Sequence, residues 1–498
     1  MEISILLEEI GGKMLFADAN LFAKYGEKIA LIGDNGCGKT TFLRILAGEI
    51  QPQNGQILSE KIIGFLRQEN DFSGNVYEFF AIKIDMESEF WRAEIALEKV
   101  GISTDNFVEF SQKMVADFSG DEKTKLALAR ILTEENLEIL LLDEPTNNLD
   151  ADSRKWLENF LKKWNETVIF ASHDRFFIDQ TAGKIWEVLD EKIREFRGNY
   201  MDFLSQKKLE KRRQQDEFAQ FDKEKKKLEA LEKLAKIKMN STSNSHYSRK
   251  SGMPKIVFNA RKNASQKSTG KKISAFQSKI SQLQNDKNVR EKPFERKDYF
   301  AKLLDEQTRK NGLVLRAENI AKNYGKREIF ANINLEIRAG EKMRITGKNG
   351  TGKSTLLKIL AGKIKPEKGE IKYSQNIKIG YVSQDAFGIK NDETLAENFA
   401  NFDREKVMKS LRVLDFMARD YRRKIGKFSR GQQTKIAILK LILDENDLLI
   451  LDEITNHIDI RAREKIENML KNYAGSVIFA THDEYFSRIF SLAKTVDL

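Results

Sequence analysis

The sequence predicts an α/β protein in which two domains of the same kind stand in tandem, joined by a long α-helical hairpin. The glycine-rich pattern G-x-x-x-x-G-K-[ST] occurs twice, at Gly33–Thr40 and at Gly347–Ser354. Each copy follows a short apolar segment and precedes an amphipathic one, the strand-loop-helix setting that gives the pattern its meaning. Between the copies lies a polar, lysine-rich connector. We therefore expect a first domain at 1–204, a connector at 205–310 and a second domain at 311–498.

The composition excludes several classes of protein. The 498-residue chain is 40% hydrophobic and 32% charged, and no apolar run approaches the ~18 residues that cross a membrane. Its N-terminus lacks the basic and apolar regions of a secretory signal. Its single cysteine, Cys37, excludes an internal disulfide and a cysteine-based zinc site. We expect a cytoplasmic protein.

The first copy carries groups that bind the phosphates of a nucleotide. Glycines let backbone N–H groups curl around phosphate oxygens, and the N-terminus of the following helix adds partial positive charge. Lys39 is expected to neutralise the terminal phosphates and Thr40 to ligate Mg²⁺. Gln68, at the end of a second strand-like segment, could reach both the metal and the attacking water. In isolation, the loop could be accidental and the glutamine would mean little.

Two further segments supply a hydroxyl that could donate a hydrogen bond to a phosphate and a carboxylate that could act as a base. Ser119 precedes a helix with one apolar face, so its hydroxyl could meet a phosphate; an ordinary helix cap is the alternative. An apolar strand ends in Asp143 and Glu144, and two adjacent carboxylates are costly unless a cation lies beside them. We interpret Asp143 as an outer-sphere magnesium partner and Glu144 as the base that polarises the attacking water.

The motifs of the first copy return in the same order in the second. A third apolar strand leads to His173, which alone would suit a structural role but in this series is placed to contact the γ-phosphate. Offsets between paired positions run from 309 for the glutamates and histidines to 316 for the glutamines. So narrow a spread indicates a tandem duplication. The second set is Lys353, Ser354, Gln384, Ser429, Gly431, Asp452, Glu453, Asp459 and His482.

Both copies resemble the ATP-binding-cassette ATPases, whose Walker A, Q-loop, signature, Walker B, D-loop and H-loop motifs all occur here in order. The resemblance implies hydrolysis of ATP with Mg²⁺ and head-to-tail pairing of the copies. One site then combines Lys39 and Glu144 with Ser429, and the other combines Lys353 and Glu453 with Ser119. The implied catalytic residues are Glu144, Glu453, His173 and His482. The implied metal contacts are Thr40, Gln68, Ser354 and Gln384. The residues implied to contact the nucleotide are these four metal contacts together with Gly33, Asn35, Gly36, Gly38, Lys39, Thr41, Ser119, Gly120, Asp143, Asp150, Tyr324, Gly347, Asn349, Gly350, Gly352, Lys353, Thr355, Ser429, Gly431, Asp452 and Asp459.

The copies differ at positions that predict unequal sites. Asp121 stands where the family has its second signature glycine, and an acid there should weaken the γ-phosphate contact unless its side chain turns away. Arg430 replaces the first signature glycine of the second copy. Tyr324 is placed to stack on adenine, whereas the aligned position of the first copy is Ile10.

The connector concentrates the positive charge of the chain. Residues 205–310 hold 29 Lys+Arg and 13 Asp+Glu, a net charge of +16 (29 − 13), against +11 for the whole chain. From Lys233 to Lys279, twelve basic residues occur without one acid. Such a block is the electrostatic footprint of a polyanionic partner, and a solvated pair of charged helices is the alternative.

Apolar residues at helical spacing predict two antiparallel helices in the connector, at about 205–239 and 271–292, with a further helical piece at about 295–310. Pro293 is expected to end the second helix. We expect a tip loop at about 240–270, in which aromatic residues alternate with basic ones. This pattern suits single-stranded or looped RNA, and a flexible loop with a small apolar cluster is the alternative. The RNA-binding candidates are Arg249, Lys250, Lys255, Phe258, Arg261 and Lys262.

Two cassettes without a membrane domain, joined by a basic helical hairpin, resemble the ABC-F family of ribosome-associated ATPases, and the Gly198-Asn-Tyr200 entry to the connector is similar to theirs. The resemblance implies that the connector reaches the 23S rRNA and the P-site tRNA region near the peptidyl-transferase centre. Some members protect ribosomes against antibiotics and others regulate translation. The long tip, the lack of an extended arm in the first copy and the end of the chain soon after His482 favour protection.

We expect one chain to pair its own two cassettes. Two other functions remain open at this point. The ATPase subunit of a transporter would bind membranes and have no use for a basic connector. A DNA-handling ATPase of this superfamily would carry zinc-binding cysteines or much longer coiled coils.

Overall fold

The computed structural model describes residues 2–10, 13–58, 61–68, 72–104, 106–147, 149–244, 255–285, 312–325, 327–347, 350–383, 388–454, 458–481, 483–490 and 494–498. The chain forms two compact units. The first comprises Met1–Phe203 and Lys297–Leu498, and the second comprises Leu204–Arg296. The first unit contains both copies of the duplicated domain, here called the first and second cassettes, and the second unit contains the connector.

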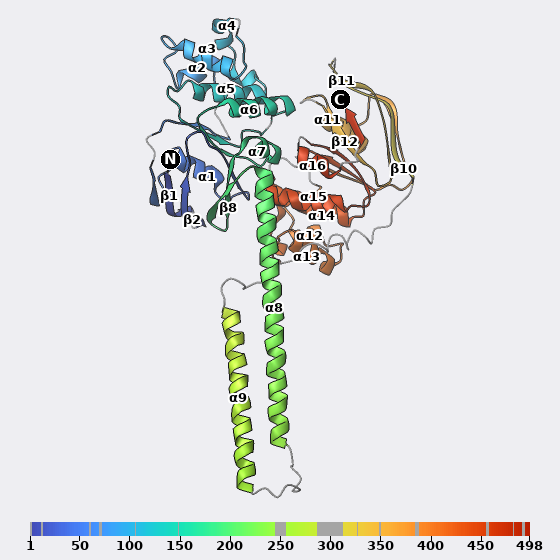
Figure 1. The fold of residues 1–498 in the computed structure, drawn as a ribbon. Coiled ribbons are helices and arrows are strands. Elements are labelled where there is room, and N and C mark those ends of the chain that lie inside the picture. The colour runs from blue at the N-terminus through green and yellow to red at the C-terminus, as the bar shows by residue number, and fades with distance from the viewer. Residues whose placement is uncertain are drawn as a thin grey trace. The chain divides into compact units, whose positions relative to one another are not determined.

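The first cassette is built on a six-stranded sheet with the order β5-β6-β7-β3-β8-β9 (Figure 1). The five strands from β5 to β8 run parallel, and β9 pairs antiparallel with β8. Every residue of β6 and β7 is buried, as expected of apolar strands covered on both faces. The strands are β3 (Lys28–Gly33), β5 (Ile63–Leu66), β6 (Ile139–Asp143), β7 (Thr167–Ala171), β8 (Lys184–Leu189) and β9 (Lys192–Arg197).

A smaller antiparallel sheet and the helices α1 to α7 complete the described part of the first cassette. The small sheet has the order β2-β1-β4, formed by β1 (Glu2–Ile10), β2 (Lys13–Phe22) and β4 (Asn54–Leu58). A helical subdomain lies between β5 and β6 in the chain, and within it α3 packs against α5. The helices are α1 (Lys39–Leu46), α2 (Val76–Ala81), α3 (Phe90–Lys99), α4 (Phe107–Ser111), α5 (Gly120–Leu132), α6 (Ala151–Lys163) and α7 (Arg175–Thr181).

The second cassette repeats this plan, which confirms the predicted α/β fold and its duplication. Its main sheet is parallel with the order β14-β15-β16-β12-β17, and its small sheet has the order β11-β10-β13. The strands are β10 (Leu313–Tyr324), β11 (Arg327–Arg338), β12 (Lys342–Thr346), β13 (Lys368–Tyr373), β14 (Ile379–Ser383), β15 (Leu448–Asp452), β16 (Ser476–Ala480) and β17 (Lys494–Asp497). The helices are α11 (Lys353–Leu360), α12 (Leu395–Asn398), α13 (Arg404–Val413), α14 (Arg430–Leu443), α15 (Ile460–Lys471) and α16 (Glu484–Ile489).

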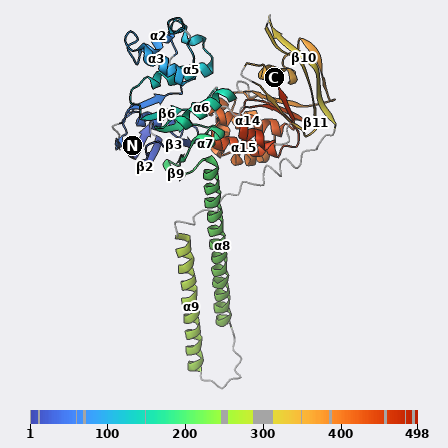
Figure 2. The ribbon, with the colours of Figure 1, turned by 45° about the horizontal axis from the view of Figure 1, so that its top comes forward.

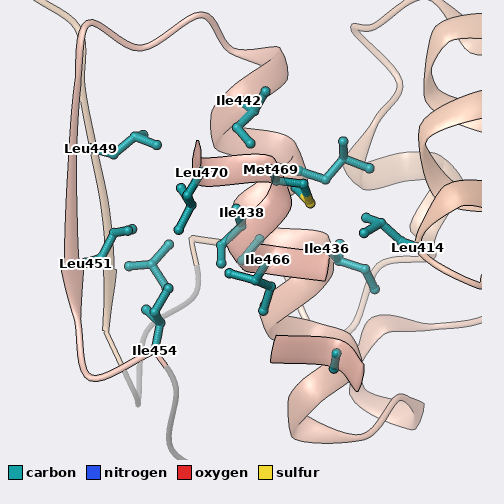
Figure 3. Packing of buried hydrophobic residues seen from close by; sticks show 14 of the residues in the cluster. Leu414, Ile436, Ile438, Ile442, Leu449, Leu451, Ile454, Ile466, Met469 and Leu470 are labelled. Carbon is teal, nitrogen blue, oxygen red and sulfur yellow. The ribbon is translucent and has the colours of Figure 1, made fainter. Parts of the chain in front are cut away.

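One apolar core holds the functional elements of the second cassette together. Side chains of α14, α15 and β15 meet in this core, and Ile438, Ile466 and Leu451 are each at most 1% exposed (Figure 3). The strand that carries Asp452, the helix that follows Ser429 and the helix that follows Asp459 therefore form one packed block. Burying a large aliphatic side chain stabilises by about 1.5–3 kcal/mol, so these three elements have little freedom to move separately.

The connector begins at a built-in corner in the first unit. Asn199 caps α8 (Tyr200–Asn244), because its side chain accepts a bond from the Asp202 backbone N–H at 3.0 Å and its own N–H donates to the Asp202 carboxylate at 3.1 Å. Gly198 has a φ of +100°, and a Cβ there would lie 2.6 Å from the Cβ of Asp202. Tyr200 is fully buried. These contacts explain why a Gly-Asn-Tyr sequence stands at the start of the helix.

The second unit consists of α8 and α9 (Lys255–Asn285), two long helices that lie side by side and antiparallel (Figure 1 and Figure 2). Half-buried or buried residues recur along α8 at Phe218, Phe221 and Leu228, and along α9 at Ile273, Phe276 and Ile280. This confirms the apolar spacing read from the sequence. Further along α8 the seam becomes less apolar, since Leu231 and Leu234 are 38% and 62% exposed. Its next contact is polar, since the Gln277 amide donates to Glu232 at 2.9 Å.

Both connector helices extend further toward the tip than predicted. The expectation of a loop over about 240–270 is wrong for the described part of that range, because α8 continues to Asn244 and α9 starts at Lys255. The serines and asparagines that suggested a loop are only weak helix formers, but no proline interrupts 255–285 and the intervening Lys, Ala and Gln residues favour a helix. Pro293 and the helical piece predicted at about 295–310 lie outside the described residues.

None of the described helices combines the length and the apolar character that a membrane span requires.

Gly270 offers a test of the continuity of α9. It lies inside the helix, and a Cβ added there would meet nothing within 4 Å. Replacing it with alanine should therefore stabilise the helix by about 1 kcal/mol, which slows local hydrogen exchange about fivefold. The exposed neighbour Ala275 provides the matched control, since A275G should speed exchange by a similar factor. Hydrogen-exchange mass spectrometry would contradict a continuous helix if G270A left exchange across 262–280 unchanged.

Candidate nucleotide-binding and hydrolysis sites

Each glycine-rich loop links a buried strand to a helix, as the motif requires. In the first cassette the loop joins β3 to α1, and Lys39 is only 8% exposed while its ammonium donates to the carbonyl of Gly33 at 2.9 Å. In the second cassette Lys353 is 7% exposed and donates to the carbonyl of Gly347 at 2.9 Å. Both lysines thus lie folded back over their loops, in position to meet an anion.

The last glycine of each loop is fixed by its backbone and its surroundings. Gly38 has a φ of +102°, and a Cβ there would lie 2.8 Å from the ring of Phe16. Gly352 has a φ of +97°, and a Cβ there would collide with Ile329. Any other residue would strain the backbone and displace the side chain below it. Of the predicted loop residues, Gly33, Asn35, Gly36, Thr41, Gly350 and Thr355 also lie in these loops or at the helix starts, and Asn349 lies outside the described residues.

The loop hydroxyls face the carboxylates that end the central strands. In the second cassette the Ser354 hydroxyl donates to Asp452 at 3.0 Å. In the first, a hydrogen bond from Thr40 acts on Asp143, although burial still raises the pKa of that carboxyl. One carboxylate oxygen of Asp143 is buried without a hydrogen-bond partner among the described residues. A hydroxyl and a buried carboxylate oxygen are hard oxygen groups of the kind that suits Mg²⁺.

The two glutamates next to these aspartates share a strained backbone. Glu144 and Glu453 both have a φ of +49°, a conformation that side-chain-bearing residues rarely adopt. The strain is held by the sheet, because the Glu144 N–H donates to the carbonyl of Ala171 at 2.9 Å and the Glu453 N–H to that of Ala480 at 3.0 Å. Strain of this kind costs about 1–3 kcal/mol and is typical of functional sites.

His173 lies directly against Glu144 in the first cassette. The His173 backbone N–H donates to one glutamate oxygen at 3.2 Å, and its Nε2 lies 3.3 Å from the other. Burial raises the pKa of Glu144 to about 7, with Lys39 opposing that effect and Asp143 adding to it. A carboxyl with a pKa near neutrality can accept a proton from water at physiological pH. His482, the counterpart of His173, lies outside the described residues.

The signature serines are both helix caps. Ser119 caps α5, exchanging hydrogen bonds with Glu122, and Ser429 caps α14, exchanging them with Gln432. Each hydroxyl therefore stands at a helix N-terminus, where partial positive charge favours an anion. Gly120 and Gly431 occupy the first turns of these helices, and Arg430 is exposed.

Asp121 turns away from the exposed tip of its helix. The Ser153 hydroxyl of α6 donates to its carboxylate at 3.1 Å. Burial raises the pKa of Asp121, and the nearby carboxylate of Asp150 raises it further. The acid is thus used inside its own cassette, where it ties the signature helix α5 to the start of α6, next to the D-loop aspartate Asp150. The repulsion expected between this acid and a phosphate is correspondingly reduced.

The glycine-rich loop of each cassette faces the D-loop of the other cassette, which contains Asp150 in the first and Asp459 in the second. Arg461, two residues after Asp459, donates to Asp34 of the first loop at 3.4 Å. Burial raises the pKa of Asp34, Arg461 lowers it, and Asp459 raises it. On the other side, burial lowers the pKa of Lys353, and Asp150 of the first cassette is among the acids that raise it. The structure therefore brings together elements of both cassettes around each loop, in the head-to-tail sense inferred from the sequence.

A buried network of charged side chains lies at the cassette interface and was not predicted from the sequence. The Arg175 guanidinium of the first cassette makes a two-pronged ion pair with Glu467 of the second, one contact being 3.0 Å. Arg463 donates to Asp483 at 2.7 Å and to the backbone carbonyl of His173 at 3.1 Å. The available signal was weak: an arginine stands four residues after each D-loop aspartate, at Arg154 and Arg463.

The other candidates are placed as follows. Gln68 is exposed, two residues beyond the end of β5. Tyr324 is the last residue of β10 and is 54% exposed, as a ring that receives a base must be. Lys255, Phe258, Arg261 and Lys262 lie on the first turns of α9. Gln384, Arg249 and Lys250 lie outside the described residues.

Comparison with known sequences identifies relatives along the whole chain. The family model described as "ABC transporter" matches residues 16–147 and 330–456. The chain is 34% identical over 495 residues to the ribosome protection protein VmlR of Bacillus subtilis, which covers 98% of this chain and 85% of that protein. It is 31% identical over 526 residues to ABC transporter F family member 5 of Arabidopsis thaliana, which covers 95% of this chain and 71% of that protein.

Comparison with solved structures shows the same two-cassette fold. The archaeal ribosome recycling factor aABCE1, solved with the ribosomal stalk protein aP1, matches with a TM-score of 0.62 and 18% identity over 99% of this chain and 87% of that chain. A structure described as RNase-L Inhibitor matches with a TM-score of 0.61 and 19% identity over 99% of this chain and 87% of that chain. At these identities the likeness concerns the fold alone.

The pKa of Glu144 predicts a pH dependence. A base must be ionised to act, and a carboxyl with a pKa of about 7 is mostly protonated at pH 6 and mostly ionised at pH 8. In an E453Q background, kcat/KM for ATP hydrolysis at the first site should be about tenfold lower at pH 6 than at pH 8. Single-turnover hydrolysis with subsaturating enzyme measures this ratio, and E144Q/E453Q supplies the background. Equal values at the two pH values would contradict a base with this pKa.

Proposed function

Because this chain belongs to the ABC-F family of tandem ATP-binding-cassette ATPases, we propose that it binds the ribosome and uses ATP to control the insertion of its basic connector near the tRNA and the peptidyl-transferase region. The chain is an ATP hydrolase of this family. The observation that carries the proposed target is the charge of α9, which holds seven basic residues and no acid in its 31 residues.

The two connector helices differ in how their charge is balanced. On α8, lysines pair with carboxylates of the same helix, as in Lys226 with Asp222 at 2.7 Å and Lys236 with Glu232 at 2.6 Å. On α9, four exposed lysines make no ion pair within the described residues. These are Lys267, Lys271, Lys272 and Lys279. A solvated pair of charged helices would mix signs on both partners, so α9 favours the polyanion instead.

The lysines of α9 also have the right position for an external partner. At 100° per residue, Lys267 and Lys271 lie on the side of the helix opposite to Phe276 and Ile280, which line the seam with α8. A helix that is apolar on one side and cationic on the other suits insertion between RNA backbones, since phosphates supply regularly spaced negative charge. Lys255, Phe258, Arg261 and Lys262 belong to the same helix and are further candidates for contact with RNA.

At each ATP site, we assign roles to residues of both cassettes. Lys39 and the loop N–H groups bind the phosphates, Glu144 polarises the attacking water, and His173 holds Glu144 in place. Ser429 of the opposite cassette closes the first site, and Lys353, Glu453 and Ser119 do the same at the second. Mg²⁺ would be held through Thr40 and Ser354, with Gln68 and Gln384 beside it, and would neutralise charge on the β- and γ-phosphates.

Protection of the ribosome against antibiotics is the more specific form of this proposal. It is supported by the similarity over 98% of the chain to a protein named as a ribosome protection protein. The alternative is a translation factor of the same family without a role in resistance. Growth in the presence of a panel of ribosome-targeting antibiotics, with and without the expressed protein, separates these two functions.

Blocking hydrolysis should trap the protein on its target. We expect E144Q/E453Q with ATP to sediment with 70S ribosomes through a sucrose cushion, since loss of both bases leaves ATP holding the cassettes closed. The wild-type protein with ADP is the control and should stay in the supernatant. If the double variant instead collected on membrane vesicles and left ribosomes free, the ATPase subunit of a transporter would be the better description.

Removing the lysines of α9 should weaken binding and its dependence on salt. For K267A/K271A/K272A/K279A, the slope of log K against log salt should fall by about 3, because each lost phosphate contact removes about 0.7–0.9. The matched variant K225A/K226A removes lysines that already pair with α8 carboxylates and should leave the slope nearly unchanged. Basal ATP hydrolysis without ribosomes should persist in both. An unaltered slope in the α9 variant would place the phosphate contacts elsewhere.

A further inference from the structure

The contact between Arg463 and the loop of His173 has a direct bearing on hydrolysis. His173 contacts both oxygens of Glu144, one through its backbone N–H at 3.2 Å and one through its ring at 3.3 Å. The carbonyl of the same residue accepts a hydrogen bond at 3.1 Å from the guanidinium of Arg463, which belongs to the other cassette. A residue of the second cassette thus fixes the backbone that orients the base of the first.

Arg463 is itself held firmly on its own side. It is 7% exposed, and the nitrogen that reaches His173 also donates to Asp483 at 2.7 Å. Its other terminal nitrogen lies 3.4 Å from the carbonyl of Ile458, directly before the D-loop aspartate. Burial opposes ionisation of Asp483, but Arg463 and Arg175 outweigh it and hold the pKa of that carboxyl below its usual value. The guanidinium therefore joins three loops in fixed positions.

We propose that Arg463 is a positioning residue for ATP hydrolysis in the first cassette: by holding the carbonyl of His173 across the interface, it sets the His173–Glu144 pair only when the cassettes are closed. Hydrolysis at the first site then depends on the partner cassette through a second contact besides Ser429. This inference rests on the ATPase activity of the family and is independent of the ribosome as target.

The ion pair between Arg175 and Glu467, which neighbours Arg463, provides a control for the test. Arg175 and Glu467 also join the cassettes and are both largely buried, but the side chain of Glu467 makes no described contact with His173 or Glu144. Removing the charge of Glu467 should loosen the interface without releasing the His173 loop. The same pair cannot form twice, because the positions 309 residues away are Glu158 and Glu484, both acids. Removing the charge of Glu467 therefore breaks an ion pair on one side of the interface only.

The geometry also explains which substitutions keep the fold. Asp483 has a second arginine, since Arg175 lies 3.5 Å from it, so removal of Arg463 does not leave this acid without a cation. Lysine at position 463 can pair with Asp483 as a point charge but lacks the fork that also reaches the His173 carbonyl and Ile458. R463K is thus a conservative variant that separates charge from positioning.

The test measures hydrolysis and ATP binding separately, on the full-length protein without ribosomes. In an E453Q background, R463A should slow single-turnover hydrolysis at saturating ATP about ten- to hundredfold, as loss of a charge-assisted hydrogen bond would. The dissociation constant for ATP, measured with a fluorescent ATP analogue, should change by less than about threefold. R463K should retain the thermal stability of the parent and recover only part of the rate.

E467Q is the matched control for interface strength. It should weaken ATP-dependent closure and ATP affinity while leaving the rate at saturating ATP near that of the parent. The proposal is overturned if R463A and E467Q slow the saturated step equally, because Arg463 would then only hold the cassettes together. It is also overturned if R463A hydrolyses bound ATP at the parental rate. Failure of ribosome binding in any of these variants bears on the proposed target and not on this inference.

Discussion

The pairing of buried charges at the cassette interface is the constraint on which the arrangement of both ATP sites depends. A guanidinium removed from water is costly unless carboxylates or carbonyls meet it with good geometry, and breaking one partner of a buried pair is strongly destabilising. Arg175 of the first cassette meets Glu467 and Asp483 of the second, while Arg463, paired with Asp483 on its own side, meets the His173 carbonyl of the first. The two cassettes consequently meet in one register, and that register places each phosphate-binding loop against the other cassette's D-loop.

The same register accounts for the division of labour within each site. The buried parallel strands deliver Asp143, Glu144 and His173 to one edge of the sheet, and the strained φ of Glu144 aims its carboxylate at the histidine loop. The signature helices begin at the exposed residues Ser119 and Ser429, and in the proposed arrangement each completes the site of the opposite cassette. A single cassette therefore holds a nucleotide but lacks part of what surrounds its phosphates. The rate of ATP hydrolysis can therefore depend on closure of the cassettes, because closure brings in the groups that a single cassette lacks.

Much of the fold and of the site could be predicted from the sequence, because the phosphate-binding loops, strand ends and helix caps are local patterns. Lys39, Ser119 and Glu144 are candidates that a few neighbouring residues are enough to indicate. The network around Arg175 could not be found this way, since Glu467 is 292 residues distant in the chain and neither residue belongs to a motif. Nor could the turn of Asp121 toward Ser153, which depends on the packing of α5 beside the D-loop. The serines and asparagines of the tip predict a loop because they are weak helix formers, but residues 255–285 contain no proline and form a continuous helix.

In the proposed mechanism, closure of the cassettes around ATP places the basic face of α9, formed by Lys267 and Lys271, against RNA. A cryo-electron microscopy structure of E144Q/E453Q with ATP and ribosomes tests it most directly. In that structure we expect Lys267 and Lys271 within hydrogen-bond distance of RNA phosphates, and Arg463 on the carbonyl of His173 between the closed cassettes. A bound complex in which α9 lies in solvent, or in which the cassettes close without ordering the connector on RNA, would contradict it.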